Sequence, residues 1–301
     1  MQSITQCLMV LIKPQKIKKK NSSMVQSEFR YAHHPEDAKK YTTEDLRREF
    51  LINDLFNDDK IKLVYSMYDR LIVGGIMPSS KALKLEPTDD LKAENFLDRR
   101  ELGIINTGGA GKVTVDGTVY HLANKEALYI GKGAKEIIFE KDGEEQPYFY
   151  INSAPAHRGY PTKKITKNEA EIVELGEEKY ANKRTINKLI VSSVVETCQL
   201  QMGMTELHPG SVWNTMPAHT HSRRMEAYFY FDLEEGHTVS HFMGQPHETR
   251  HLFMTNRQAV LSPEWSIHSG VGTTHYTFIW GMAGENMDYG DMDGIKTNEL
   301  K

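Results

Sequence analysis

The stretch Asn214-Thr-Met-Pro-Ala-His219-Thr-His221-Ser-Arg-Arg-Met-Glu226-Ala-Tyr-Phe-Tyr-Phe-Asp232 decides how the whole chain is interpreted. If its first part is a strand, His219 and His221 point to the same face, because side chains two residues apart lie on one side. After a short polar turn over residues 222–224, Glu226 begins a second strand. Two imidazoles and a carboxylate can then converge on one point, which suits a divalent transition metal.

The second strand alternates between two kinds of face. Glu226, Tyr228, Tyr230 and Asp232 fall on one side, and Ala227, Phe229 and Phe231 fall on the other. The aromatic residues are interpreted first as packing, and the tyrosines second as lining of a site.

A fourth metal ligand is available in Pro263-Glu-Trp-Ser-Ile-His268-Ser-Gly-Val-Gly272, where His268 lies between a proline turn and a glycine-rich turn. Most of the 13 histidines are expected at the surface or in the core. Two of them, His251 and His275, are candidates for hydrogen-bond partners of a ligand ring.

Composition excludes several classes of function. The 301 residues carry a formal net charge of −4 and neither half is strongly basic, which argues against a nucleic-acid partner. No apolar run of 18 or more residues exists, so no membrane partner is expected. The two cysteines, Cys7 and Cys198, are too few for a disulfide framework and favour a reducing compartment.

Residues 1–23 are expected to be a disordered extension. A short apolar run over residues 7–12 precedes five lysines, which is the reverse of the order in a secretory signal. The globular pattern begins only after Met24, which we expect to be the physiological start.

The remaining pattern predicts a mainly all-β fold with a few short helices. Residues 42–56 read as an amphipathic helix capped by Thr42 or Thr43, and strands follow from residue 61 to residue 151. Among them, Asp116-Gly117 predicts a type I′ hairpin over residues 112–122. Residues 152–186 are expected to connect two domains and to contain a short helix within residues 168–175. Strands resume from about residue 187, so we expect two antiparallel sandwich or barrel domains, at 24–151 and 187–301.

The spacing of the three histidines and the glutamate resembles the two motifs of the cupin superfamily. Longer stretches are similar to the 5-keto-4-deoxyuronate isomerase family (4-deoxy-L-threo-5-hexosulose-uronate ketol-isomerase), from about Met24 to the C-terminus. They are Leu46-Arg-Arg-Glu-Phe-Leu, Ile72-Val-Gly-Gly-Ile-Met-Pro78, Arg99-Arg-Glu-Leu-Gly103, Tyr129-Ile-Gly-Lys-Gly-Ala-Lys135, Tyr160-Pro-Thr-Lys-Lys164, Arg184-Thr-Ile-Asn-Lys188, Glu196-Thr-Cys-Gln-Leu200, Trp213-Asn-Thr-Met-Pro217, Met243-Gly-Gln-Pro246, Glu248-Thr-Arg-His251 and Trp265-Ser-Ile-His-Ser-Gly-Val-Gly272.

The resemblance implies a two-cupin β-fold, a homohexamer, one zinc ion (Zn²⁺) per subunit and a cytoplasmic location. The ligands it implies are His219, His221, Glu226 and His268, with an N-terminal cupin-like domain that carries no metal ligands. It also implies a small sugar-acid substrate and a reaction of pectin and uronate breakdown. That reaction interconverts 5-dehydro-4-deoxy-D-glucuronate and 3-deoxy-D-glycero-2,5-hexodiulosonate.

Such a reaction needs a general base, and the substrate carboxylate needs a cation. Candidates for the base are Tyr228, Tyr230, Glu196 and Glu248. Candidates for binding the carboxylate are Arg223, Arg224 and Arg184, with Arg250 in reserve.

Three other interpretations of the metal motif remain open. A site with four protein ligands also looks like a closed structural zinc site. A cupin dioxygenase could hold iron on three histidines and a glutamate. A sugar-binding cupin could hold a uronate without turnover.

Overall fold

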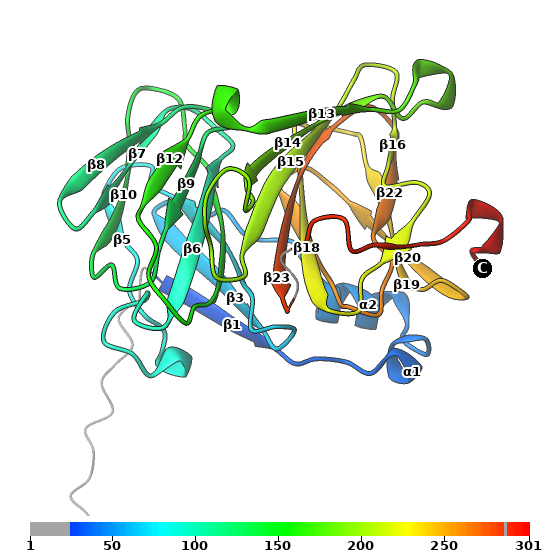
Figure 1. Cartoon of the computed structure of the whole chain (residues 1–301), viewed down its shortest axis with the longest axis horizontal. Helices are drawn as coiled ribbons and strands as arrows, with labels where there is room; N and C mark the ends of the chain where they lie inside the picture. The colour runs from blue at the N-terminus through cyan, green and yellow to red at the C-terminus, as the bar shows by residue number, and fades with distance from the viewer. Residues whose placement is uncertain (1–24, 286–287) are drawn as a thin grey trace, which may run out of the picture.

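Residues 25–285 and 288–301, the part of the chain that the computed structural model describes, form two similar halves that lie side by side (Figure 1). Each half has a seven-stranded and a four-stranded sheet. Among the described strands, the β1–β3 pair is parallel and the other pairs are antiparallel. The predicted all-β fold is confirmed; the predicted extension over residues 1–23 lies outside the described residues.

The N-terminal half contains the first pair of sheets. Its large sheet has the order β1 (Val25–Arg30), β3 (Lys60–Ser66), β4 (Ile72–Met77), β11 (Phe149–Pro155), β6 (Arg100–Asn106), β9 (Ala127–Ile130), β12 (Lys163–Ile165). Its small sheet has the order β5 (Leu83–Lys84), β10 (Ile137–Lys141), β7 (Gly111–Val115), β8 (Thr118–Leu122).

The C-terminal half repeats this plan. Its large sheet has the order β13 (Glu171–Leu175), β14 (Arg184–Ile190), β15 (Gln201–Leu207), β23 (Thr277–Gly284), β18 (Arg224–Phe231), β21 (Gln258–Ser262), β2 (Leu51–Ile52). Its small sheet has the order β16 (Trp213–Asn214), β22 (Ser269–Gly272), β19 (Val239–Gln245), β20 (Glu248–Met254). A short ladder joins β17 (His219–Thr220) to β24 (Asp293–Gly294).

The two large sheets pack against each other, so their central strands are buried on both faces. All eight residues of β18 are buried. The predicted alternation is confirmed there, because Tyr228 and Tyr230 face the four-stranded sheet while Phe229 stacks on Tyr150 of the other half, 4.6 Å between ring centroids. Gly281 permits this close approach, since a Cβ there would lie 1.8 Å from Asn152 Oδ1. Strand β18 is therefore packed between the four-stranded sheet of its own half and the large sheet of the other half.

The hairpin prediction is confirmed in its turn as well as in its strands. Asp116 and Gly117 join β7 to β8 with positive φ values of 46° and 84°, as a type I′ turn requires.

The predicted helix over residues 42–56 is too long. Helix α2 (Thr43–Phe50) follows a four-residue helix, α1 (Pro35–Ala38), and Leu51 is already extended. Leu51 and Ile52 are buried and pair as β2 with β21, so a ladder with the C-terminal half outweighs the local helical pattern. Neither helix in the described part of the chain has the length and apolar character needed to cross a membrane.

Thr42 caps α2 with a reciprocal pair of hydrogen bonds. The Asp45 amide donates to Thr42 Oγ1 (3.2 Å), and the Thr42 amide donates to Asp45 Oδ2 (3.0 Å). We expect Thr42→Ala to lower the free energy of unfolding by about 1 kcal/mol, because the Asp45 amide in the first helical turn loses its acceptor, Thr42 Oγ1. Urea unfolding measures this, with Thr43→Ala as the exposed neighbouring control; equal losses in both variants would contradict the role of the cap.

The helix predicted within residues 168–175 is wrong. Residues 167–169 form a 3₁₀ turn, and residues 171–175 form β13, which pairs with β14 over five residues. Strands β12 and β13 both lie in the expected connector, and each extends one of the large sheets. The division into 24–151, 152–186 and 187–301 stays a prediction.

Candidate metal centre

Three neighbouring segments of the C-terminal half carry the four predicted ligands. His219 lies in β17, His221 follows it, Glu226 lies in β18, and His268 directly precedes β22. The continuous strand predicted from residue 214 is wrong: Thr215 has a φ of +46° and Pro217 has no N–H for a ladder, so the segment divides into β16 and β17. The two histidines nevertheless reach the same centre as Glu226.

The four ligand atoms cluster tightly, all within 4.8 Å of one another. His268 Nε2 lies 2.9 Å from His219 Nε2 and 3.0 Å from Glu226 Oε2. His221 Nε2 lies 3.1 Å from the same carboxylate oxygen. Atoms that each sit about 2 Å from a shared ion are separated by about this much, so the set fits a divalent metal.

Hydrogen bonds to the opposite ring nitrogens orient two of the imidazoles. His221 Nδ1 lies 3.0 Å from the carbonyl oxygen of Arg224, and His268 Nδ1 lies 3.2 Å from Ser262 Oγ. These contacts leave Nε2 of both rings directed at the centre. The predicted partners, His251 and His275, are wrong, because both are exposed at the surface.

Burial and mutual contact set the charges of the ligands. Burial lowers the pKa of His219 to about 3, so this ring is neutral at pH 7. Burial alone would raise the pKa of Glu226, but the imidazoles of His268 and His221 outweigh it and hold that pKa well below its ordinary range. A neutral imidazole and an ionised carboxylate are the forms that bind metals.

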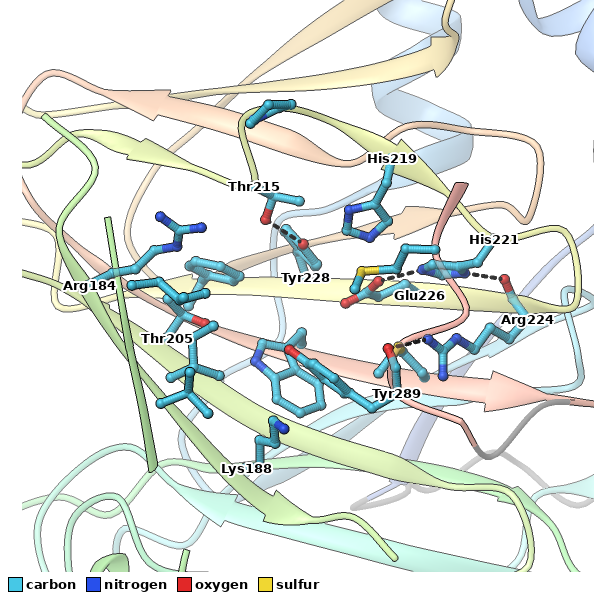
Figure 2. A pocket seen from close by; sticks show the side chains of 18 residues that line it. Arg184, Lys188, Thr205, Thr215, His219, His221, Arg224, Glu226, Tyr228 and Tyr289 are labelled. Carbon is cyan, nitrogen blue, oxygen red and sulfur yellow. Dashed lines mark hydrogen bonds and ion pairs between the residues drawn. The ribbon is translucent and has the colours of Figure 1, made fainter. Parts of the chain in front are cut away.

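Three members of the cluster, His219, His221 and Glu226, line a cavity of about 270 Å³, a size suited to a small ligand (Figure 2). Its lining combines charged groups with an apolar floor. The lining residues are Val173, Leu175, Arg184, Ile186, Lys188, Thr205, Thr215, Pro217, His219, His221, Arg224, Glu226, Tyr228, Phe278, Trp280, Met282, Tyr289 and Met292.

Only Tyr228 of the four candidate bases lines this cavity. Its hydroxyl lies 3.1 Å from Thr215 Oγ1, and burial raises its pKa well above the ordinary value. Tyr230 is fully buried beneath it, with its hydroxyl 2.8 Å from His241 Nδ1. Glu196 and Glu248 are exposed and lie outside the lining.

Of the four arginines considered as partners of the substrate carboxylate, two line the cavity and two lie outside its lining. Arg184 and Arg224 line the cavity. Arg223 points to solvent, where it pairs with Glu285, and the reserve candidate Arg250 pairs with Glu248 away from the site.

Several lining residues have no local signal in the sequence. Lys188, Thr205, Trp280 and Tyr289 reach the cavity from β14, β15, β23 and the C-terminal segment. The strand period does put Arg184, Ile186 and Lys188 on one face of β14. Which face meets the metal depends on packing between strands far apart in the chain.

The paired β-sandwiches, with a three-histidine, one-glutamate cluster in one of them, place the protein among the cupin-type β-folds. A solved IolB-like protein from Salmonella typhimurium shares this fold, with a TM-score of 0.61 at 13% identity over 75% of this chain and 87% of that one. The chain belongs to the KduI/IolB family, whose family model matches residues 50–294.

Curated relatives in this family are similar over almost their whole length. The protein named 4-deoxy-L-threo-5-hexosulose-uronate ketol-isomerase from Formosa agariphila is 59% identical over 275 residues, which cover 91% of this chain and 98% of that protein. A protein of the same name from Bacteroides fragilis is 58% identical, with the same coverage.

Proposed function

We propose that this protein is a metal-dependent ketol-isomerase that interconverts 5-dehydro-4-deoxy-D-glucuronate and 3-deoxy-D-glycero-2,5-hexodiulosonate. The observation that carries the proposal is the clustering of His219, His221, Glu226 and His268, of which the first three line a ligand-sized cavity. The names of relatives at 58–59% identity support the reaction.

The exchange moves one proton between C1 and C2 of the substrate and another between their oxygens. A bound divalent ion supplies a Lewis acid for the negative charge that develops on those oxygens. His219, His221, His268 and Glu226 would hold it, and the single carboxylate cancels only part of its charge.

Tyr228 would contact the reacting end of the substrate. Its ring lies 5.4 Å from that of His268, between centroids, and its hydroxyl is held beside Thr215. As a phenol it can donate a hydrogen bond to a substrate oxygen or pass a proton between the two oxygens.

Zinc is the ion we propose, because three imidazoles and one carboxylate suit it and offer no thiolate or oxygen-rich set. Assembly as a homohexamer and a cytoplasmic location, both expected from the family resemblance, belong to the same proposal. Sedimentation equilibrium of the purified protein tests the hexamer.

Incubating the protein with the unsaturated-uronate product of a lyase, and following the sugar by NMR, tests the reaction. We expect conversion of the aldehyde to the ketone, loss of conversion after chelation, and recovery when zinc is restored. Conversion that survives complete metal removal would contradict metal dependence and favour a structural ion. Oxygen uptake with bound iron would favour the dioxygenase, and tight uronate binding without product would favour the non-catalytic cupin.

A further inference from the structure

The charges around the cavity are unevenly compensated. Three lining residues are cations, Arg184, Lys188 and Arg224, whereas among the described residues Glu226 is the one acid of the lining. Two of the three cations form ion pairs with carboxylates that are not part of the cavity lining. Lys188 Nζ lies 2.6 Å from Glu171 Oε1, and Arg224 Nη2 lies 2.5 Å from Asp291 Oδ1.

Arg184 has no such partner within the described part of the chain. Its one hydrogen bond runs from Nη1 to the carbonyl oxygen of Asn182 (2.8 Å). The side chain is half-buried, and burial lowers the pKa of its guanidinium. A partly desolvated cation without a counter-charge is unfavourable until an anion binds to it.

The geometry of the free donors also separates Arg184 from Arg224. A guanidinium binds a carboxylate in a fork through Nε and Nη2 or through Nη1 and Nη2. In Arg224, Nη2 is occupied by Asp291 and by the Tyr289 carbonyl oxygen, so both forks are blocked although Nε and Nη1 are unpartnered. In Arg184 the Nε–Nη2 edge has no partner among residues 25–285 and 288–301.

Arg184 and the metal cluster lie in different parts of the same cavity lining. Figure 2 shows it at one side of the cavity, with Tyr228 between it and the metal-ligand cluster, while Arg224 lies beside His221. The substrate of the proposed function carries its carboxylate at C6, at the far end from the reacting C1 and C2. Apolar side chains, among them Ile186 and Phe278, also line the cavity and suit the unsubstituted methylene at C4.

A second unsatisfied donor lies in the same lining. The indole Nε1 of Trp280 is buried and has no hydrogen-bond partner among the described residues. The 2-oxo acid end of the substrate offers a keto oxygen next to its carboxylate, which such a donor can bind.

We propose that Arg184 is the anchor for the substrate carboxylate and that it sets which end of the chain reaches the metal. This inference rests on the proposed function and adds the determinant that selects an acyclic 2-oxo acid over a neutral sugar. Arg184 is a positioning residue in this account, because it binds the end of the substrate that does not react.

Kinetics of Arg184→Gln and Arg184→Lys test the anchor. We expect Arg184→Gln to raise KM about 10- to 100-fold, with kcat within a few-fold and metal content unchanged, because a charge-assisted fork is lost. Arg184→Lys keeps the charge without the fork and is expected to fall between Gln and the parent. The control Arg223→Gln, at the surface, is expected to match the parent. An unchanged KM in Arg184→Gln, or a loss of bound metal, would overturn the inference.

Calorimetry separates this inference from the reaction itself. The metal-loaded parent should bind 2-oxobutanoate at least about tenfold more tightly than uncharged 2-butanone, and Arg184→Gln should remove that difference. If the parent makes no isomerised product but shows this difference, the proposed reaction fails and the anion site stands. If product forms and the difference persists in Arg184→Gln, the anchor fails and the reaction stands.

Discussion

Replacing His221 by alanine is expected to abolish metal binding and turnover together. The side chain is 3% exposed, its Nε2 lies 3.1 Å from Glu226 Oε2, and its Nδ1 is held by the backbone of Arg224. Mutating a residue that hydrogen-bonds to a metal-bound imidazole typically lowers metal affinity by about 10- to 100-fold. Removing the imidazole itself should therefore lower metal affinity by at least about 100-fold. Loss of Lewis-acid stabilisation of a few kcal/mol lowers turnover by about 1000-fold.

Metal analysis of the dialysed protein and the NMR assay measure both effects in one sample. His251→Ala is the matched control, because His251 is exposed on β20 and lies outside the cluster. We expect the control to keep its metal and its activity. A metal-free His221→Ala protein that still turned over substrate would count against Lewis-acid catalysis by this centre.

The second large effect concerns Glu101, whose buried carboxylate ties the two halves together. Its side chain in β6 is fully buried and accepts hydrogen bonds from the backbone amides of Cys198, Gln199 and Leu200 at 2.8–2.9 Å. The Tyr129 hydroxyl donates a fourth, at 2.7 Å. The three amides belong to the loop that leads into β15. One side chain of the N-terminal half therefore holds in place the loop that enters the large sheet of the C-terminal half.

Glu101→Ala should therefore lower the free energy of unfolding by about 3 to 5 kcal/mol, because three backbone amides and the buried Tyr129 hydroxyl lose their acceptor. Glu140→Ala is the control: Glu140 pairs with Lys112 at 3.5 Å near the surface and should change stability by less than about 1 kcal/mol. Urea unfolding of both variants measures the difference. A Glu101→Ala protein within 1 kcal/mol of the parent would show that the loop has another support.

Short-range patterns predict the residues of the three-histidine, one-glutamate cluster and much of the fold, because the rules behind those patterns are local. The i, i+2 spacing of His219 and His221, the alternation of β18 and the Asp116-Gly117 turn each act within a few residues. The same locality explains the errors. The helix predicted to residue 56 ends at Phe50 because Leu51 and Ile52 find a ladder on β21, more than 200 residues later.

The residues that line the cavity are harder to predict from the sequence than the cluster, because they come from segments that are far apart in the chain. Glu196 and Glu248 have suitable chemistry and were candidates, but they are exposed, because strand pairing and not sequence distance decides which side chains meet. Trp280 and Tyr289 lie in the lining although nothing near them in the sequence marks a site.

X-ray absorption spectroscopy of the bound ion, with and without substrate, tests the central claim most directly. The account predicts a nitrogen and oxygen shell that contains three imidazoles, lost in His221→Ala, and a change in that shell when the keto-uronate is added. A shell without imidazole, or one that stays unchanged while substrate is being converted, would contradict it.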